Sequence, residues 1–368
     1  MTERLLFTSA VGFEAARRVM LFAEGHRSRR LHGHSFLAKI RTRVPEEFPL
    51  FPGAEVTQLR HLLTQAVQPL DYQFLNDKLP GEPTDENLAR WLREQLPLPH
   101  VEMVGIQSTQ HEGVDLDRDG HAYVWQRYVF DSAHQLPHVP PGHPCGRLHG
   151  HGFAVIVHAN KHIGMGDISI DYDHLAALWN PIFQQLHGRC LNEIPGLENP
   201  TSEMISRWIW QRLKPELPEL SWVTVFETAS SGAHYDGNVF RIWKELSLDS
   251  AVRLLRAPEG DQRSHVHGHT FTLRLHLNAP LDEVMGWTVD FGDIKRAFNP
   301  IFTLLDHHPL HEQKDLMDTD CASIARWIQS QATPLLPHLD RVDLYENPGC
   351  GVILFRDDAG LGSIEPDQ

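Results

Sequence analysis

Paired histidines recur in this 368-residue sequence in a form suited to binding a metal ion. The tripeptide His-Gly-His occurs three times, beginning at His32, His149 and His267. Alternate residues of a β-strand point to the same face, so each tripeptide would present two imidazoles side by side. Before the middle copy, His134 ends a further alternating segment. Three histidines with an open fourth position are typical of catalytic zinc. The sequence therefore predicts a zinc site formed by His134, His149 and His151.

A cysteine, Cys145, lies four residues before the middle histidine pair, in GHPCGRLHGH. A thiol close to a divalent metal and imidazoles ionises more readily, and the thiolate is its reactive form. Two other interpretations stay open at this point: Cys145 is a fourth zinc ligand, or it is a small residue without a chemical role.

The positions of these residues reveal a threefold internal repeat. His-Gly-His recurs after 117 and then 118 residues, and Trp91, Trp208 and Trp327 recur at nearly the same spacing. Such a long period is unlike a solenoid repeat, because each unit has the size of a small domain. The sequence predicts three units at residues 1–122, 123–243 and 244–368.

Each unit has the hydrophobic pattern of two strands, two helices and two more strands. Residues 201–214 (TSEMISRWIWQRLK) carry apolar groups at helical spacing, and Thr201 is suited to cap that helix. The predicted fold class is α+β, with an antiparallel sheet covered by two helices in each unit. Such a sheet has two open edges, so three copies in one chain could join edges and close a barrel with threefold pseudo-symmetry.

Composition excludes several classes of protein. The formal net charge of −15 argues against a partner bound through phosphates, such as nucleic acid. Four cysteines do not form a disulfide framework, which favours a reducing compartment. The sequence contains neither an apolar run long enough to span a membrane nor the pattern of a secretory signal. We therefore expect a cytoplasmic protein.

The middle unit resembles the 6-pyruvoyltetrahydropterin synthase family. The resemblance rests on HQLPHVPPGHPCGRLHGHGF, LNEIPGLENPTSEMISRWIW and VFETASSGAHY, and it is greatest for the bacterial branch, the 6-carboxytetrahydropterin synthases. It implies the tunnelling fold, in which three subunits close a twelve-stranded barrel. It also implies a zinc enzyme that acts on 7,8-dihydroneopterin triphosphate, and barrels that stack in pairs, here a homodimer of pseudo-trimers.

The resemblance also implies a role for individual residues. His134, His149 and His151 would bind Zn²⁺, and Cys145 would remove a proton from the substrate. Glu227 would anchor the pterin ring, with Thr201 and Ser202 beside it. In the family an Asp-His pair from a neighbouring subunit relays protons, and that pair is replaced in the middle unit by His187-Gly188.

The outer units depart from the family pattern in complementary ways. The third unit keeps the relay pair, Asp306 and His307, and the anchor Glu346. It has Val252 in place of the first metal histidine and Arg263 in place of the cysteine. In the first unit we align Val11 with the first histidine, Ser28 with the cysteine, Asp71-Tyr72 with the relay pair and Gln107 with the anchor. Neither outer unit should bind metal tightly.

These losses predict one composite active site per chain. The second unit would supply metal ligands, thiol and anchor, and the third would supply Asp306 and His307. The opposite order around the ring would place Asp71 and Tyr72 at the site and leave no complete site. The predicted reaction forms 6-carboxytetrahydropterin. The alternatives are a lyase that forms 6-pyruvoyltetrahydropterin, and a pterin-binding or regulatory protein whose active site has decayed.

Overall fold

A computed structural model describes residues 3–162 and 170–356. Every repeat has the predicted order of two strands, two helices and two strands. The elements of the first repeat are β1 (Arg4–Arg17), β2 (His32–Thr42), α1 (Glu55–Val67), the short β3 (Gln73–Phe74), α2 (Asp85–Gln95), β4 (Val101–Thr109) and β5 (Glu112–Asp117).

The other two repeats follow the same plan. The second consists of β6 (His121–His134), β7 (His149–His162), α3 (Tyr172–Leu186), α4 (Ser202–Leu213), β8 (Leu220–Thr228) and β9 (Ser231–Tyr235). The third consists of β10 (Phe240–Val252), β11 (His267–Leu277), α5 (Phe291–Leu305), α6 (Cys321–Ala332), β12 (Leu339–Asn347) and β13 (Cys350–Phe355).

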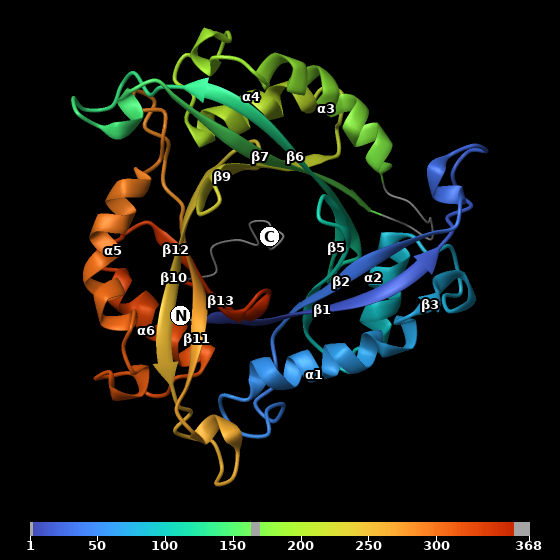
Figure 1. Ribbon diagram of the computed structural model, residues 1–368, viewed down its shortest axis with the longest axis vertical. Coiled ribbons are helices and arrows are strands. Elements are labelled where there is room, and N and C mark those ends of the chain that lie inside the picture. Colours follow the sequence, from blue (N-terminus) through green and yellow to red (C-terminus); the bar gives the residue numbers. More distant parts are fainter. Residues whose placement is uncertain (1–2, 163–169, 357–368) are drawn as a thin grey trace.

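The strands form one closed antiparallel barrel, as the sequence predicts. Neighbouring strands pair in chain order from β4 to β13, and β4 is followed by β2 and β1. The pairing of β1 with β13, which includes Leu6 opposite Ile353, closes the ring. The described residues contain twelve barrel strands besides the two-residue β3, together with six α-helices. Figure 1 shows the strands around the centre and the helices on the outside. Closure removes the open sheet edges that a single repeat would expose.

The core lies between the barrel and the helices. Alternate strand residues such as Val155 and Val157 face this layer, where they pack with buried helix residues such as Leu59 and Ile209. Phe130 on β6 stacks on Phe153 of β7, with ring centroids 5.0 Å apart, just beyond the His-Gly-His residues. This packing fixes the two strands that carry the predicted metal ligands.

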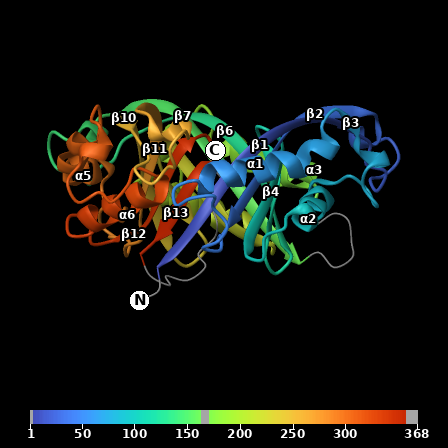
Figure 2. The same cartoon turned by 90° about the horizontal axis from the view of Figure 1, so that it is seen from below.

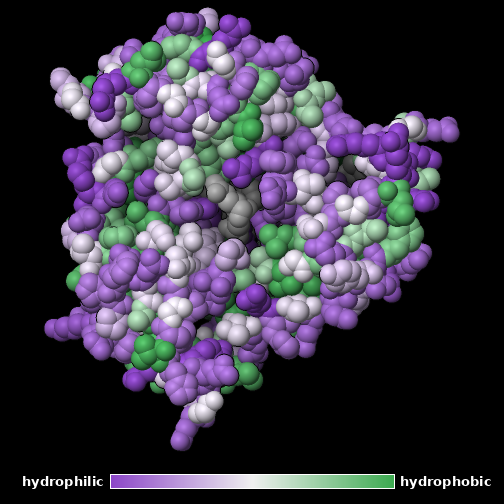
Figure 3. Space-filling view, viewed as in Figure 1, coloured by the Kyte–Doolittle hydropathy of each residue, from purple (hydrophilic) through white to green (hydrophobic). Residues whose placement is uncertain are grey.

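The antiparallel order brings the three His-Gly-His motifs to one rim of the barrel. Strands β1, β6 and β10 run in the same direction, and each turns at that rim into the strand that begins with the motif. The side view in Figure 2 shows these hairpins along one edge of the molecule. The face seen in Figure 3 is mostly hydrophilic, with apolar residues in separate small patches. None of the helices in the described ranges has the length and apolar character needed to cross a membrane.

Candidate active site

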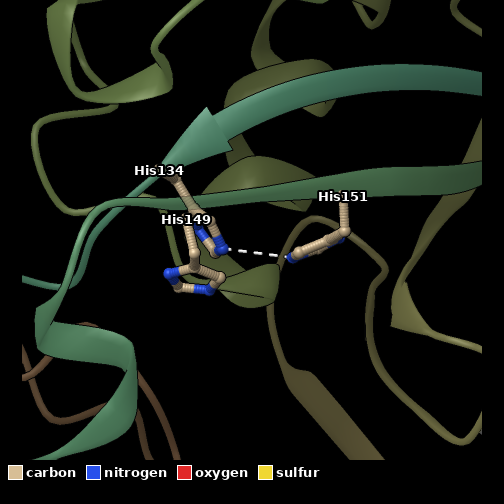
Figure 4. A group of neighbouring side chains, drawn as sticks. All are labelled: His134, His149 and His151. Carbon is tan, nitrogen blue, oxygen red and sulfur yellow. Dashed lines mark hydrogen bonds between the residues drawn. The ribbon is translucent and has the colours of Figure 1, made fainter.

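Three histidines of the second repeat converge at the barrel rim. His134, at the end of β6, lies opposite His149 at the start of β7, and His151 follows on the same face. One ring nitrogen from each lies within 4.8 Å of the others. The Nε2 atoms of His134 and His151 are 3.2 Å apart (Figure 4). The structure thus brings together all three predicted metal ligands.

Backbone carbonyls orient these rings. The Nδ1–H groups of His134, His149 and His151 donate to the carbonyls of Pro200, Arg147 and Gly152, at 3.1, 2.8 and 3.2 Å. These bonds leave the three Nε2 atoms free to accept a cation, an arrangement typical of metal-binding histidines. Burial lowers the pKa of His134 to about 4, so its ring is neutral, as a ligand must be. The donor set therefore fits a divalent metal such as zinc.

Strand register corrects one alignment in the first repeat. His134 pairs with His149 and Val252 pairs with His267, but the residue opposite His32 is Arg17. Our assignment of Val11 to this position was therefore wrong, because Val11 lies six residues earlier on β1. An arginine does not replace a neutral imidazole as a ligand, since its guanidinium stays protonated. Among the described residues, neither outer repeat forms a three-histidine cluster.

A cavity of about 230 Å³ lies beside the histidine cluster, between the second and third repeats. Leu136, two residues after His134, lines it together with Cys145 and Glu227. The third repeat contributes the opposite wall, which comprises Trp287, Val289, Asp290, Phe291 and Gly292. The third repeat is thus the one that borders the site of the second, at the N-terminal end of α5.

The loop that carries Cys145 is held from both repeats. The backbone N–H of Cys145 donates to Nδ1 of His143 at 3.2 Å, and Nε2 of His143 lies 3.2 Å from Oδ2 of Asp290 in the third repeat. Burial raises the pKa of the Cys145 thiol, and the nearby carboxylates of Glu227 and Asp290 raise it further. A cation bound by the neighbouring histidines would favour the thiolate instead.

The predicted anchor residues also meet at this cavity. The hydroxyl of Ser202 donates to Oε2 of Glu227 at 2.7 Å. Thr201 caps α4 by accepting the N–H of Met204, and its own hydroxyl donates to the carbonyl of Gly286 in the third repeat. Glu227 therefore has a fixed carboxylate orientation, whereas the Thr201 hydroxyl proton is already used within the protein.

Register corrects a second alignment. Glu227 and Glu346 both lie at a strand irregularity, after Phe226 and Tyr345 respectively. The equivalent irregularity in β4 lies between Gln107 and Thr109, so Ser108 corresponds to these glutamates. Our assignment of Gln107 to the anchor position was therefore wrong by one residue.

The sequence model of the 6-pyruvoyl tetrahydropterin synthase family matches residues 7–114, 123–238 and 241–357. These three segments cover most of the chain and correspond to the three structural repeats. The chain belongs to this family. Individual relatives match about one repeat each, as expected for a chain that contains three synthase units in tandem.

Two curated relatives match about a third of the chain. The 6-carboxy-5,6,7,8-tetrahydropterin synthase of Synechocystis is 37% identical over 119 residues, which are 30% of this chain and 91% of that protein. The dihydroneopterin monophosphate aldolase of Pyrococcus furiosus is 32% identical over 117 residues, 31% of this chain and 96% of that protein. The family and the first relative support a lyase-type enzyme.

A solved structure of the same family is similar to part of this chain. It is the 6-pyruvoyl tetrahydropterin synthase of Caenorhabditis elegans, at a TM-score of 0.30 and 16% identity, with 33% of this chain and 96% of that chain covered.

Asp306 and His307, the predicted relay pair of this synthase-family chain, lie at the other end of α5 from the cavity. Oδ2 of Asp306 is 2.8 Å from Nδ1 of His307, and its Oδ1 accepts the N–H of Asp249 on β10. The 15 residues of α5 separate the pair from the cavity by about 22 Å of helix. The structure does not bring the pair to Cys145 within one chain, and its catalytic role stays a prediction.

The backbone is left-handed at the pair, as it is at the equivalent residues of the other two repeats, Tyr72 with φ of 55° and Gly188. His307 has φ of 57°, in the left-handed region that favours glycine, and the equivalent residue of the second repeat is Gly188 with φ of 70°. The His307 side chain is 75% exposed, and the pair contacts Asp249, three residues before the end of β10 at the barrel rim. Asp306 and His307 hold each other in place, and carboxylate hydrogen bonds lower the pKa of Asp306 while raising that of His307.

Sequence reasoning missed several residues that line the cavity. Glu203 is buried, and its Oε1 accepts the N–H of Thr288 from the third repeat at 2.8 Å. Burial raises the pKa of Glu203 to about 7. His143 could have been found from its place two residues before Cys145. Residues 287–292 belong to another repeat, so no local pattern in the second repeat indicates them.

Proposed function

We propose that the protein is a Zn²⁺-dependent lyase that converts 7,8-dihydroneopterin triphosphate and water to 6-carboxy-5,6,7,8-tetrahydropterin, acetaldehyde and triphosphate. This is the reaction of the queuosine precursor pathway. The observation that carries the proposal is a three-histidine cluster next to a cavity that Cys145 and Glu227 line. The relatedness to the Synechocystis synthase supports the same reaction.

His134, His149 and His151 would hold the zinc ion. When bound, Zn²⁺ acts as a Lewis acid toward the oxygens of a substrate side chain, which makes neighbouring protons easier to remove. The chain itself supplies the rest of the chemistry. Cys145 lines the cavity next to the cluster and would accept a proton from the substrate.

The pterin ring would bind by its edge and its faces. A carboxylate can pair with two adjacent N–H groups of an amidine-like edge, and the Ser202 hydroxyl holds Glu227 in one orientation for this pairing. Trp287 and Phe291 of the third repeat provide aromatic surface on the opposite wall. Thr201 would form part of the cavity wall beside the ring, and Ser202 would orient Glu227.

Asp306 and His307 would relay protons to a second chain. The pair lies far from the cavity of its own chain, and its exposed imidazole stands near the rim where the metal sites open. A homodimer that stacks two rims together would place the pair of one chain opposite the cavity of the other. We therefore propose a homodimer of pseudo-trimers with sites completed across the dimer contact.

Product identification tests the reaction. The zinc-loaded protein is incubated with 7,8-dihydroneopterin triphosphate, and the products are separated and identified by mass spectrometry. The proposal requires 6-carboxytetrahydropterin and acetaldehyde. A pyruvoyl product would assign the alternative lyase reaction, and absence of any product from folded, zinc-loaded protein would favour a pterin-binding protein.

Cys145→Ala should abolish turnover and leave the metal content unchanged, because the thiol is not needed to complete the histidine cluster. Ser28→Ala, at the equivalent position of the first repeat, is the matched control and should keep wild-type turnover. Loss of zinc from Cys145→Ala would instead identify Cys145 as a metal ligand.

A further inference from the structure

A second cavity lies between the third and first repeats, at the position equivalent to the cavity beside Cys145. Its volume is about 580 Å³, compared with about 230 Å³ for the first. The ends of β10 and β11 and the loop between them form one side, and Gly53 and Thr57 at the start of α1 form the other. The proposed reaction makes no use of this cavity.

The cavity keeps a counterpart of Glu227, the carboxylate that we propose anchors the pterin ring in the second repeat. Glu346 occupies the same strand irregularity as Glu227 and lines the wall. Its Oε2 accepts the S–H of Cys321 at 3.5 Å, just as Glu227 accepts the hydroxyl of Ser202. Burial raises the pKa of Glu346. In the described ranges its carboxylate forms no ion pair, so it is available to a ligand with N–H donors.

The groups that would carry out the reaction are missing from this cavity. Val252 stands where His134 supplies the buried metal ligand, which leaves only His267 and His269 at the rim. Arg263 stands where Cys145 supplies the thiol, because both follow a capping side chain in equivalent short helices. The cavity therefore keeps a binding group and lacks the metal set and the thiol.

The position of Arg263 leaves the cavity open. Its guanidinium is held by the carboxylate of Asp261, at 2.9 Å from Nε to Oδ1 and 2.7 Å from Nη2 to Oδ2. It also stacks over the ring of Phe51 from the first repeat, 4.5 Å from the ring centroid. Arg263 is thus turned to its own loop, and it does not neutralise Glu346 by direct contact.

We propose that this cavity is a second, metal-free binding site for a planar heterocycle with the 2-amino-4-oxo edge of a pterin, which guanine presents as its 2-amino-6-oxo edge. The ligand would pair two N–H groups with the carboxylate of Glu346 and would not be converted. The expectation that the heterocycle is a pterin rests on the proposed function. The site would then hold substrate, product or a related purine while the second repeat carries out the reaction.

Binding stoichiometry tests this site. Neopterin, which lacks the triphosphate, is titrated into the zinc-loaded full chain by isothermal titration calorimetry, and guanosine is titrated in a parallel series. We expect two neopterin sites per chain. Glu346→Gln should remove one of them, or weaken it at least tenfold, and Glu227→Gln should remove the other. Binding of guanosine at the Glu346-dependent site would identify a purine as its ligand.

A second variant tests the site without changing Glu346, in case Glu346→Gln disturbs the fold. Thr57→Trp leaves Glu346 intact and fills the cavity from the α1 side, so it should also remove one site. Both Glu346→Gln and Thr57→Trp should keep wild-type turnover of dihydroneopterin triphosphate. A single site per chain that only Glu227→Gln removes would overturn the proposal without affecting the proposed reaction. Absence of turnover with two intact binding sites would overturn the reaction alone.

Discussion

One position at the end of the first strand of each repeat decides the character of each site. His134 completes a three-histidine cluster there, and Val252 leaves an apolar wall. Arg17 instead donates to Oδ1 of Asp85 at 2.6 Å, in a buried ion pair. Oδ2 of Asp85 accepts hydroxyl groups from Ser108 and, across the repeat boundary, from Tyr172. The first-repeat site is thus filled by the protein's own charges, and it joins two repeats.

Metal binding should depend on His134 alone among these equivalent positions. The wild type should bind about one zinc ion per chain, because within residues 3–162 and 170–356 only the second repeat has three converging imidazoles. Loss of a direct ligand in His134→Ala should weaken zinc binding by more than the roughly 10–100-fold that an outer-shell partner contributes. Elemental analysis of the dialysed protein measures this. His267→Ala is the matched control and should keep the ion, whereas three ions per wild-type chain would contradict the single site.

Glu203 should make stability fall as the pH rises. Its folded-state pKa of about 7 lies above the ordinary value of 4.5, so the folded protein keeps a proton that the unfolded chain has released. The associated stability is present below pH 4.5 and is lost as the pH approaches 7, an effect of the order of 3 kcal/mol. Urea unfolding between pH 4.5 and 7 should show this slope, and Glu203→Gln should lack it. Glu198 is exposed, so the control variant Glu198→Gln should keep the same decrease of stability with rising pH.

At the scale of elements, the N-terminus of α5 is the part of the third repeat that shapes the active site. Asp290 caps this helix by accepting the N–H groups of Gly292 and Asp293 through Oδ1, and its Oδ2 faces His143. One carboxylate therefore fixes both the helix that carries the aromatic wall and the loop that carries the thiol. The start of α5 and the loop of Cys145 are positioned together.

Asp290→Asn should separate these two roles, because asparagine still caps a helix but its amide cannot accept the His143 proton at the Oδ2 position. We expect KM to rise several-fold to tenfold, equivalent to about 1 kcal/mol, with zinc content unchanged. Steady-state kinetics with elemental analysis measure both. Asp171→Asn is the matched control, since Asp171 caps α3 at the joint without a thiol. Equal effects of the two variants would show a purely structural role.

At the scale of the whole molecule, the three joints between neighbouring repeats of the closed ring differ in the residues that they contain. The joint of repeats one and two contains the Arg17–Asp85 ion pair, and the joint of two and three carries Cys145 and Glu227. The joint of three and one is an open cavity around Glu346. Fusion of three units in one chain permits this specialisation, because identical subunits would have three identical joints.

Mixing two inactive variants should restore activity if the relay pair acts between chains. In a dimer of Cys145→Ala with His307→Ala, one site combines an intact thiol with an intact imidazole from the partner. Each isolated mixed dimer would then have one intact site of two and about half of wild-type turnover. The mixture is refolded together, mixed dimers are isolated through two tags, and turnover is measured. Inactive mixed dimers would show that the pair does not act across the contact.

The sequence alone determined the threefold repeat, the barrel and the types of residue at the metal cluster. These features follow from strand alternation and from short spacings such as His149 to His151, which fix neighbours directly. The sequence alignment assigned Val11 and Gln107 to the positions that Arg17 and Ser108 occupy. Similar residue types occur a few residues away, and only strand pairing establishes which residues lie opposite each other. Register is set by hydrogen bonds between distant segments, and a shift of one residue moves a side chain to the other face.

Only the tertiary structure decided which repeat completes which site. The order around the ring follows from the pairing of β1 with β13 and of β9 with β10, contacts between segments that carry no mark of their partners in the sequence. Closure therefore brought Trp287 and Asp290 to Cys145 and placed His307 at the far end of α5. Residue chemistry is local and can be read along the chain, whereas a site at a joint exists only once the ring has closed.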